Sequence, residues 1–388
     1  MKRKCKNVDI CDGDLILRAV LQCFAPNKKR RRHDTIHLFK RYLPNHTRKE
    51  VVQILRDKNM YYFDACFAIA KDLQDTLLSG EDLGLPIPRQ AVRIDPGSGK
   101  SRNISVLGIR QLMFDHVAVL ALSDVCKRIG VTQVSSIKGR GAHYGLKFIK
   151  KWLKSSKKKL YSVKLDIKNF YGSVDRDCLM GWLEKRIANE PLLDLIRKLI
   201  YSVPQGMAIG SFLSQTLANL YLSDLYHFAK ENCATYRKDK KTGKLKRYNH
   251  ILHTLFYMDD MLFIGTNKRH ITKAVKAIIA RAKEVLCLTI KPSWQVHKIS
   301  KRHPVDMMGF RVSPGGTVTL RKHIFKKARR LMLKVKRGNF ALRQALRLMS
   351  YRGYMLSAAT KYVQRTLNAI KSFSRASNII SYYAQAAR

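Results

Sequence analysis

The chain has 388 residues, and 46% of them are hydrophobic, so it can build two or three packed subregions and is not a disordered tail. Lysine and arginine number 76 against 27 aspartate and glutamate residues, a formal net charge of +49. Positive charges in such excess repel one another, so we expect a polyanionic partner. A long nucleic acid is the first candidate, and an anionic membrane is the second. No apolar run near membrane length supports the second choice, so we expect no membrane partner.

The cysteines are scattered, with no Cys-x-x-Cys pair and no nearby pair of histidines. This spacing predicts neither structural zinc nor a disulfide framework, and it is typical of a reducing compartment. The N-terminal stretch "MKRKCKNVDICDGD" lacks the apolar core of a secretory signal. We therefore expect a cytoplasmic protein. The eight cysteines are Cys5, Cys11, Cys23, Cys66, Cys126, Cys178, Cys233 and Cys287.

The first half of the chain begins with helices and continues with strands. Residues 1–85 carry apolar positions at helical spacing, and the glycines and prolines of "GEDLGLPIPRQ" predict a boundary near residue 85. "AVRIDPGSGKSRNISVLG" predicts two strands around a Pro-Gly-Ser-Gly turn, and "KKLYSVKLDI" predicts a further strand. Residues 176–201 predict a helix with a break near Asn189–Pro191.

The second half alternates helices with short hairpins. Residues 211–230 predict a helix, and "YRKDKKTGKLKRYNHI" predicts a charged hairpin around Thr242-Gly243. An amphipathic helix follows at 269–286, then a short hairpin at 305–320, and the chain from Arg321 onward is helical and basic. This order predicts a mixed antiparallel sheet covered by helices, in the α+β class.

One stretch, "LFYMDDMLFIG" (255–265), places the adjacent carboxylates Asp259 and Asp260 between two apolar flanks. The flanks predict two buried strands joined by a tight turn. Adjacent aspartates repel each other, and burying them is costly unless a cation neutralises them. Two interpretations follow, a solvent-exposed Asp-Asp turn or a divalent-metal site at the tip of a hairpin.

A third carboxylate, Asp166, ends the apolar strand Leu160–Leu165. It precedes Asp259 by 93 residues, so only a sheet can bring the two together. Three carboxylates from two strands form the pattern that holds two Mg²⁺ ions for phosphoryl transfer. The alternative for Asp166 is a helix N-cap or a turn.

The motifs "KLDIKNFYGSVD", "PQGMAIGSFLSQTLANLYL", "FYMDD", "LTIKPSW" and "VDMMGFRV" occur in the order and spacing of the reverse transcriptases. The chain resembles that family from about residue 86 to the C-terminus. The resemblance implies an RNA-directed DNA polymerase with a right-hand fold of fingers, palm and thumb. It also implies that Asp166, Asp259 and Asp260 are catalytic and hold two Mg²⁺ ions, or Mn²⁺, helped by the backbone carbonyl of Ile167.

The resemblance implies four domains. These are a helical N-terminal extension (1–85), fingers (86–160), a palm (161–320) and a helical, basic thumb (321–388). The palm contains a finger-like segment and the basic hairpin insertion 237–247.

Further site residues follow from the same resemblance. Tyr171 matches the aromatic gate that excludes a 2′-hydroxyl, although an ordinary half-buried tyrosine is the alternative. The predicted nucleotide-binding residues are Lys100, Arg102, Tyr171, Gln215 and Lys291, and for Lys291 a solvated lysine is equally compatible with the sequence. The predicted template and primer contacts are Ile209, Gly210, Met308, Gly309 and Phe310.

The stretch "IGSFLSQ" (209–215) carries Ser-Gln where most reverse transcriptases have Ser-Pro, and in this it resembles the enzymes of diversity-generating retroelements. That group copies a dedicated, structured RNA into cDNA with errors at adenines. The partners implied are the template RNA, the cDNA and its RNA–DNA duplex, dNTPs, and a small accessory protein or a homo-oligomer. A defence-associated reverse transcriptase with its own noncoding RNA is the second hypothesis, and a non-catalytic RNA-binding scaffold is the third.

Overall fold

The structure is a computed structural model that describes residues 2–30, 32–94, 101–239, 242–337, 341–358, 365 and 368–386. It divides into two compact units, and each is built from several stretches of the chain. The first comprises Met1–Gly130, Ile167–Leu225 and Ile279–Ile290, and the second Val131–Asp166, Tyr226–Ile278 and Lys291–Arg388. The chain therefore passes from one unit to the other several times, because each unit is assembled from segments that are distant in the sequence.

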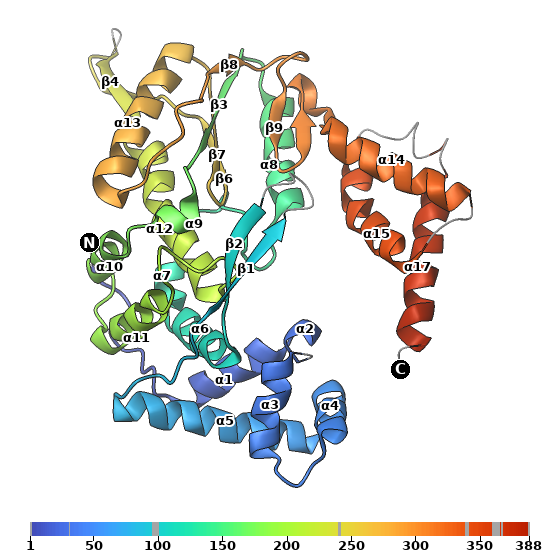
Figure 1. The fold of residues 1–388 in the computed structure, drawn as a ribbon. Helices are drawn as coiled ribbons and strands as arrows, with labels where there is room; N and C mark the ends of the chain where they lie inside the picture. The colour runs from blue at the N-terminus through green and yellow to red at the C-terminus, as the bar shows by residue number, and fades with distance from the viewer. Residues whose placement is uncertain are drawn as a thin grey trace. The chain divides into compact units, whose positions relative to one another are not determined.

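The first unit is mainly helical (Figure 1). Local signals in the sequence begin its helices, for example the capping box of Thr47 and Glu50 on α4 and the Asn189 cap with the following proline on α11. Its only sheet among the described residues is the antiparallel pair β1–β2. The elements are α1 (Gly13–Phe24), α2 (Asn27–Arg30), α3 (His33–Tyr42), α4 (Arg48–Asp57), α5 (Met60–Ser79), β1 (Arg89–Ile94), β2 (Ser101–Val106), α6 (Ile109–Ala121), α7 (Ser123–Cys126), α9 (Phe170–Ser173), α10 (Arg176–Glu184), α11 (Glu190–Tyr201) and most of α12 (Phe212–Glu231).

The second unit contains the larger sheets. A four-stranded antiparallel sheet has the order β6-β7-β3-β8, and a three-stranded sheet has the order β11-β10-β9. The elements are α8 (Ala142–Ser155), β3 (Tyr161–Asp166), β4 (Ala234–Lys238), β5 (Leu245–Asn249), β6 (His253–Tyr257), β7 (Asp260–Gly265), most of α13 (Lys268–Leu286), β8 (His297–Lys298), β9 (Val305–Met307), β10 (Phe310–Val312), the 3₁₀ turn η1 (Pro314–Gly316), β11 (Val318–Leu320), α14 (Lys322–Lys336), α15 (Leu342–Ser357) and α17 (Ala369–Ala386).

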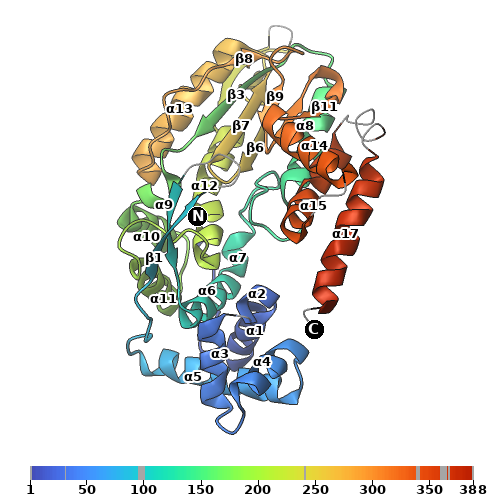
Figure 2. The ribbon, with the colours of Figure 1, turned by 45° about the vertical axis from the view of Figure 1, so that its right-hand side comes forward.

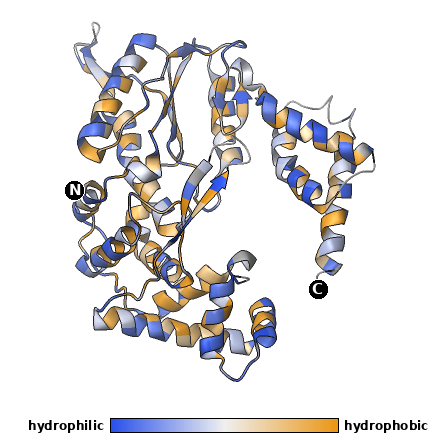
Figure 3. Cartoon of the chain, viewed as in Figure 1, coloured by the Kyte–Doolittle hydropathy of each residue, from blue (hydrophilic) through white to orange (hydrophobic). Residues whose placement is uncertain are grey.

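The core of the second unit joins its sheets to its helices. Leu146, Ile149 and Leu153 form the apolar stripe of α8, and they belong to the same buried cluster as β6, β7 and the three-stranded sheet. The helices α14, α15 and α17 pack against one another and continue this cluster (Figure 2). Hydrophilic and hydrophobic residues both occur along α14 and α15 (Figure 3), as expected of helices with one buried face.

The predicted α+β class is confirmed, and three local expectations need revision. The predicted hairpin at 305–320 is a three-stranded sheet, because β10 pairs with β9 on one side and with β11 on the other. The helices α6 and α8 were not predicted. Within the described ranges, every helix is too short or too polar to serve as a membrane span.

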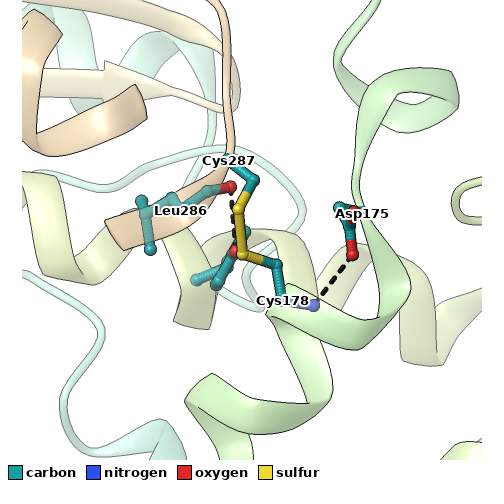
Figure 4. The surroundings of a disulfide bond; sticks show 5 residues. Asp175, Cys178, Leu286 and Cys287 are labelled. Atoms are coloured by element: carbon teal, nitrogen blue, oxygen red, sulfur yellow. Dashed lines mark hydrogen bonds between the residues drawn. A yellow bond between two sulfur atoms is a disulfide. The ribbon is translucent and has the colours of Figure 1, made fainter. Parts of the chain in front are cut away.

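The third revision concerns the cysteines. Cys178 and Cys287 form a disulfide in the first unit, with their Cα atoms 6.5 Å apart, and the other six cysteines are free (Figure 4). Cys178 follows the cap of α10, where its N–H donates to Asp175, and Cys287 directly follows the end of α13. The expectation of no disulfide framework missed this bond because 109 residues separate the two cysteines, and only helix packing brings them together.

Candidate active site

The predicted carboxylates Asp166 and Asp260 lie opposite each other on neighbouring strands of the second unit. Asp166 ends β3 and Asp260 begins β7, and the antiparallel register pairs them directly. Side chains of directly opposed residues share one face of a sheet, so the two carboxylates are neighbours. The sheet that the sequence required to join Asp166 to the hairpin is present.

The third carboxylate, Asp259, lies in the turn between β6 and β7. Tyr257 pairs with Asp260, which leaves Met258 and Asp259 as the two turn residues. Met258 is buried and has φ of 56°, a left-handed conformation that glycine usually occupies. Strained residues of this kind persist where the surrounding structure holds them, here the buried strands on both sides.

Two lysines neutralise the paired carboxylates. Lys291 Nζ lies 2.6 Å from Asp166 Oδ2, and Lys164 Nζ lies 3.0 Å from Asp260 Oδ1. Lys291 was predicted as a nucleotide contact, and in this structure it binds Asp166. Lys164 was not singled out, although its position two residues before Asp166 places both side chains on the same face of β3.

Among the described residues, no lysine forms an ion pair with Asp259. Burial raises the pKa of its carboxyl, the charges of Asp166 and Asp260 raise it further, and the charge of Lys291 opposes them. In the described part of the chain, no group of three or more His, Cys, Asp or Glu side chains lies close enough together to hold a metal ion in the present arrangement. The three carboxylates are nevertheless near enough to repel one another, and oxygen donors of this kind suit a hard divalent cation.

The first unit holds the predicted residue Tyr171 beside the Pro204-Gln205-Gly206 loop. Met207 N–H donates to the Tyr171 carbonyl at 2.8 Å. Gly206 has φ of +60°, and a Cβ there would lie 2.2 Å from the same carbonyl oxygen, so the loop requires glycine. Tyr171 itself is half-buried.

The predicted segment Ile209–Gln215 leads into α12 and is anchored by a residue that was not predicted. Asp115 on α6 is buried, and its Oδ2 accepts a hydrogen bond of 2.6 Å from Ser211 Oγ. Burial raises the pKa of Asp115 to about 7, against the hydrogen bond from Ser211, which lowers it. Ser211 Oγ also accepts from Ser214 N–H at 3.0 Å. The signal in the sequence was a lone acid within the apolar run "QLMFDHVAVL". Ile209 and Gln215 are half-buried, and Gly210 is exposed.

Met308, Gly309 and Phe310 form the turn into β10. Met308 and Gly309 have φ of 54° and 87°, and a Cβ on Gly309 would lie 2.7 Å from Ile324 and 2.9 Å from Tyr354. The turn therefore packs closely against α14 and α15 of the same unit.

The remaining predicted residues are placed only in part. Ile167 follows Asp166, is buried, and forms a bridge with Ile290. Arg102 lies on β2 opposite Arg93. Lys100 lies outside the described residues.

Residues 91–312, more than half of the chain, match the sequence profile of the family described as reverse transcriptase (RNA-dependent DNA polymerase), so the chain belongs to this family. The predicted enzyme class is the class of the family, and the predicted right-hand polymerase fold is confirmed with it. Reverse transcriptase domains generally use divalent metal ions. No curated protein matches the chain.

Two solved telomerase structures resemble the chain. One is apo telomerase from Candida tropicalis truncated from its C-terminal domain, with a TM-score of 0.42 and 14% identity over 66% of this chain. The other is telomerase from Candida albicans in complex with the TWJ fragment of telomeric RNA, with a TM-score of 0.43 and 12% identity over 85% of this chain. The matches cover 60% and 66% of those two chains, so this chain spans less than two thirds of either.

Proposed function

We propose that the chain makes cDNA from an RNA template by nucleotidyl transfer at Asp166, Asp259 and Asp260. The observation that carries the proposal is the direct pairing of Asp166 with Asp260 across β3 and β7, with Asp259 in the adjoining turn. Three carboxylates at one end of a sheet repel one another unless a cation lies between them. Because the family generally uses divalent ions, such a cation explains why the three carboxylates lie together.

The carboxylates would hold two Mg²⁺ ions, which Mn²⁺ can replace, with the Ile167 carbonyl as a further oxygen donor. When bound, such ions would supply activation of the primer 3′-hydroxyl and neutralisation of the charge on the leaving pyrophosphate. The chain's own part is to offset the negative charge of the carboxylates. Lys291 and Lys164 do this for Asp166 and Asp260 through their ion pairs.

The surrounding residues would bind the substrates. Tyr171 would close the space that a 2′-hydroxyl needs, with the Gly206 loop holding its backbone in place. Arg102, Lys100 and Lys291 would contact the triphosphate of the dNTP, and Gln215 the nucleotide itself. Ile209 and Gly210 would lie along the template, and the turn of Met308, Gly309 and Phe310 along the primer.

The direct test is primer extension on an RNA template with dNTPs. We expect extension with Mg²⁺ or Mn²⁺, loss on chelation with EDTA, and recovery when the metal is restored. Extension that persists after chelation would contradict the metal assignment.

Tyr171→Ala tests the gate separately. Removal of the ring should admit ribonucleotides in a competition assay with both nucleotide types. Tyr171→Phe, which keeps the ring, is the matched control and should still exclude them. Unchanged discrimination in Tyr171→Ala would remove this residue from the site.

The partner we propose is structured template RNA, held partly by the hairpin β4–β5. Arg237 faces Lys246 across the two strands, and Tyr236 and Tyr248 are 62% and 40% exposed. Basic residues suit phosphates, and exposed aromatic rings suit unpaired bases. From Arg237 to Arg247 the chain carries seven basic residues and one acid.

The biological setting we propose is a diversity-generating retroelement, supported by Ser-Gln in "IGSFLSQ". The neighbouring DNA tests it. A pair of repeats that differ at adenines, beside a small accessory gene, is the expected arrangement. A noncoding RNA gene without such repeats would instead favour a role in phage defence.

A further inference from the structure

A hollow of about 370 Å³ in the second unit lies on the same face of the sheet as Asp166 and Asp260. Ser162 and Lys164 alternate with Asp166 along β3, and His297 on β8 is the register partner of Ser162. These three side chains therefore form the floor of the hollow. The segment Arg302–Asp306 and Arg311 on β10 form its walls.

The charges around the hollow are mostly positive. Lys164, Arg302 and Arg311 line it, and the imidazole rings of His297 and His303 stack with their centroids 5.4 Å apart. The only carboxylate among the lining residues is that of Asp306, and it is already paired with Arg321 Nε at 2.5 Å. Neither Arg302 nor Arg311 forms an ion pair with a carboxylate among the described residues. Two arginines that line the hollow are therefore without a carboxylate ion-pair partner in this part of the structure.

The positive charge continues beyond this hollow. A second, more open hollow of about 490 Å³ shares Asp306 and Arg311 with the first, and it reaches Lys322 and Lys326 at the beginning of α14. Several cationic donors in adjoining hollows suit a ligand with several phosphate groups better than they suit a single carboxylate.

We propose that the hollow of Lys164, Arg302 and Arg311 is a binding site for a phosphate-bearing anion, whose phosphates the three cations contact while the imidazoles donate hydrogen bonds. The phosphates come either from a free nucleoside or inorganic oligophosphate or from the end of a nucleic-acid strand. None of the residues proposed above for nucleotide, template or primer binding lines this hollow.

The site is connected to the carboxylates through Lys164. Lys164 lines the hollow, and its ammonium group binds Asp260 Oδ1 at 3.0 Å. An anion in the hollow competes with Asp260 for the same donors, which draws the lysine away from the carboxylate. This second step, unlike the binding itself, rests on the proposed function, because it matters only if Asp260 has a cation to bind.

Binding is tested with inorganic tripolyphosphate by isothermal titration calorimetry, in metal-free buffer and without primer or template. The double variant Arg302→Gln/Arg311→Gln should bind at least about tenfold more weakly, since each charged hydrogen bond contributes at least that factor. Because the whole chain is basic, the matched control is Arg269→Gln/Lys276→Gln, which removes two exposed charges from α13. Equal affinity of the two double variants, both for tripolyphosphate and for the RNA with a 5′-triphosphate used next, would overturn the site, whatever happens to polymerase activity.

The source of the phosphates is resolved by repeating the titration with a short single-stranded RNA carrying a 5′-triphosphate. If Arg302→Gln/Arg311→Gln lowers the affinity for both ligands, free oligophosphate is sufficient for binding at this site. Weakening of the RNA alone assigns the site to the end of a strand.

Competition for Lys164 is tested with Asp260→Asn, which releases the lysine. Tripolyphosphate should bind several-fold more tightly to this variant than to Asp239→Asn, which removes one acid from the hairpin β4–β5. Equal affinities in these two variants would show that Lys164 is not shared, and the link to Asp260 would be abandoned.

Discussion

Two hairpins follow each other in the second unit, and they differ in almost every physical respect. In β6–β7 the residues Met261–Ile264 are buried to within about 1% exposure. In β4–β5 every residue of β5 is exposed, and so are the last three of β4. The hairpin β6–β7 forms one side of a four-stranded sheet, in which β7 lies between β6 and β3, whereas among the described residues β4–β5 is a two-stranded ribbon.

The turns of the two hairpins show the consequence of this difference. The buried hairpin tolerates Met258 at φ of 56°, because its strands are held by the core on both sides. The exposed hairpin uses Gly243 at φ of +67°, where glycine carries no strain. The buried strands therefore support a backbone conformation at Met258 that this residue does not favour by itself, and Asp259 lies in that turn. The exposed turn instead has glycine at the position with positive φ.

The exposed hairpin is held instead by polar contacts at its base. His250 N–H donates to the Cys233 carbonyl at 2.9 Å, and Arg247 donates to the carbonyls of Lys230 and Glu231 at the C-terminal end of α12. An isolated two-stranded hairpin is marginal in water, so these contacts matter more than the strand pairing.

The largest contrast should appear when one carboxylate is removed from each turn. Asp259→Asn should reduce primer extension by at least about 1,000-fold, because electrostatic stabilisation of the transferring phosphoryl group is lost. RNA binding measured by filter retention should remain, since the basic surface is unchanged. Asp239→Asn, at the end of β4, should extend a simple primer–template normally. If Asp259→Asn also extends normally, the catalytic assignment is wrong.

Removal of one aromatic ring from each hairpin should lower the free energy of unfolding by very different amounts. Phe263→Ala opens a cavity in the core and should cost about 3–5 kcal/mol in the free energy of unfolding. Tyr236→Ala on the exposed strand should change it by less than about 0.5 kcal/mol. Urea unfolding of both variants checks this, and similar midpoints would mean that β4–β5 is covered in solution.

Replacement of residues 237–247 by a short Gly-Ser linker should affect RNA binding without affecting the chemistry. Affinity for the native structured RNA should fall, and the log–log salt slope should become shallower by about 0.7 for each lost phosphate contact. Extension on a simple primer–template should be spared. If both activities are lost together, the hairpin supports the fold and the RNA contact is withdrawn.

The smallest effect should come from the base of the exposed hairpin. Arg247→Gln removes the guanidinium contact with the end of α12 and should destabilise the unit by about 1 kcal/mol. Lys246→Gln, the next residue along β5, is the matched control and should be neutral. Thermal melting compares the two, and equal shifts would show that the α12 carbonyls do not anchor the hairpin.

Local sequence pattern was sufficient for both hairpins, for the strand ending at Asp166 and for most of the long helices, but not for α6 and α8. Alternating or continuous apolar residues and turn-forming pairs act over a few residues, so they can be recognised without knowledge of the fold. The motif order likewise led to the reverse transcriptase family, which the profile match confirms. The roles of individual site residues remain predictions.

Contacts between distant segments were decided only by the tertiary structure. The pairing of Lys164 with Asp260, the hydrogen bond from Ser211 to buried Asp115 and the disulfide of Cys178 with Cys287 each join residues about 100 positions apart. Such contacts depend on strand register and helix packing, in which a shift of one residue moves a side chain to the opposite face. The convergence of Arg302 and Arg311 on one hollow has the same origin, because neither residue stands out in a chain that carries 76 basic residues.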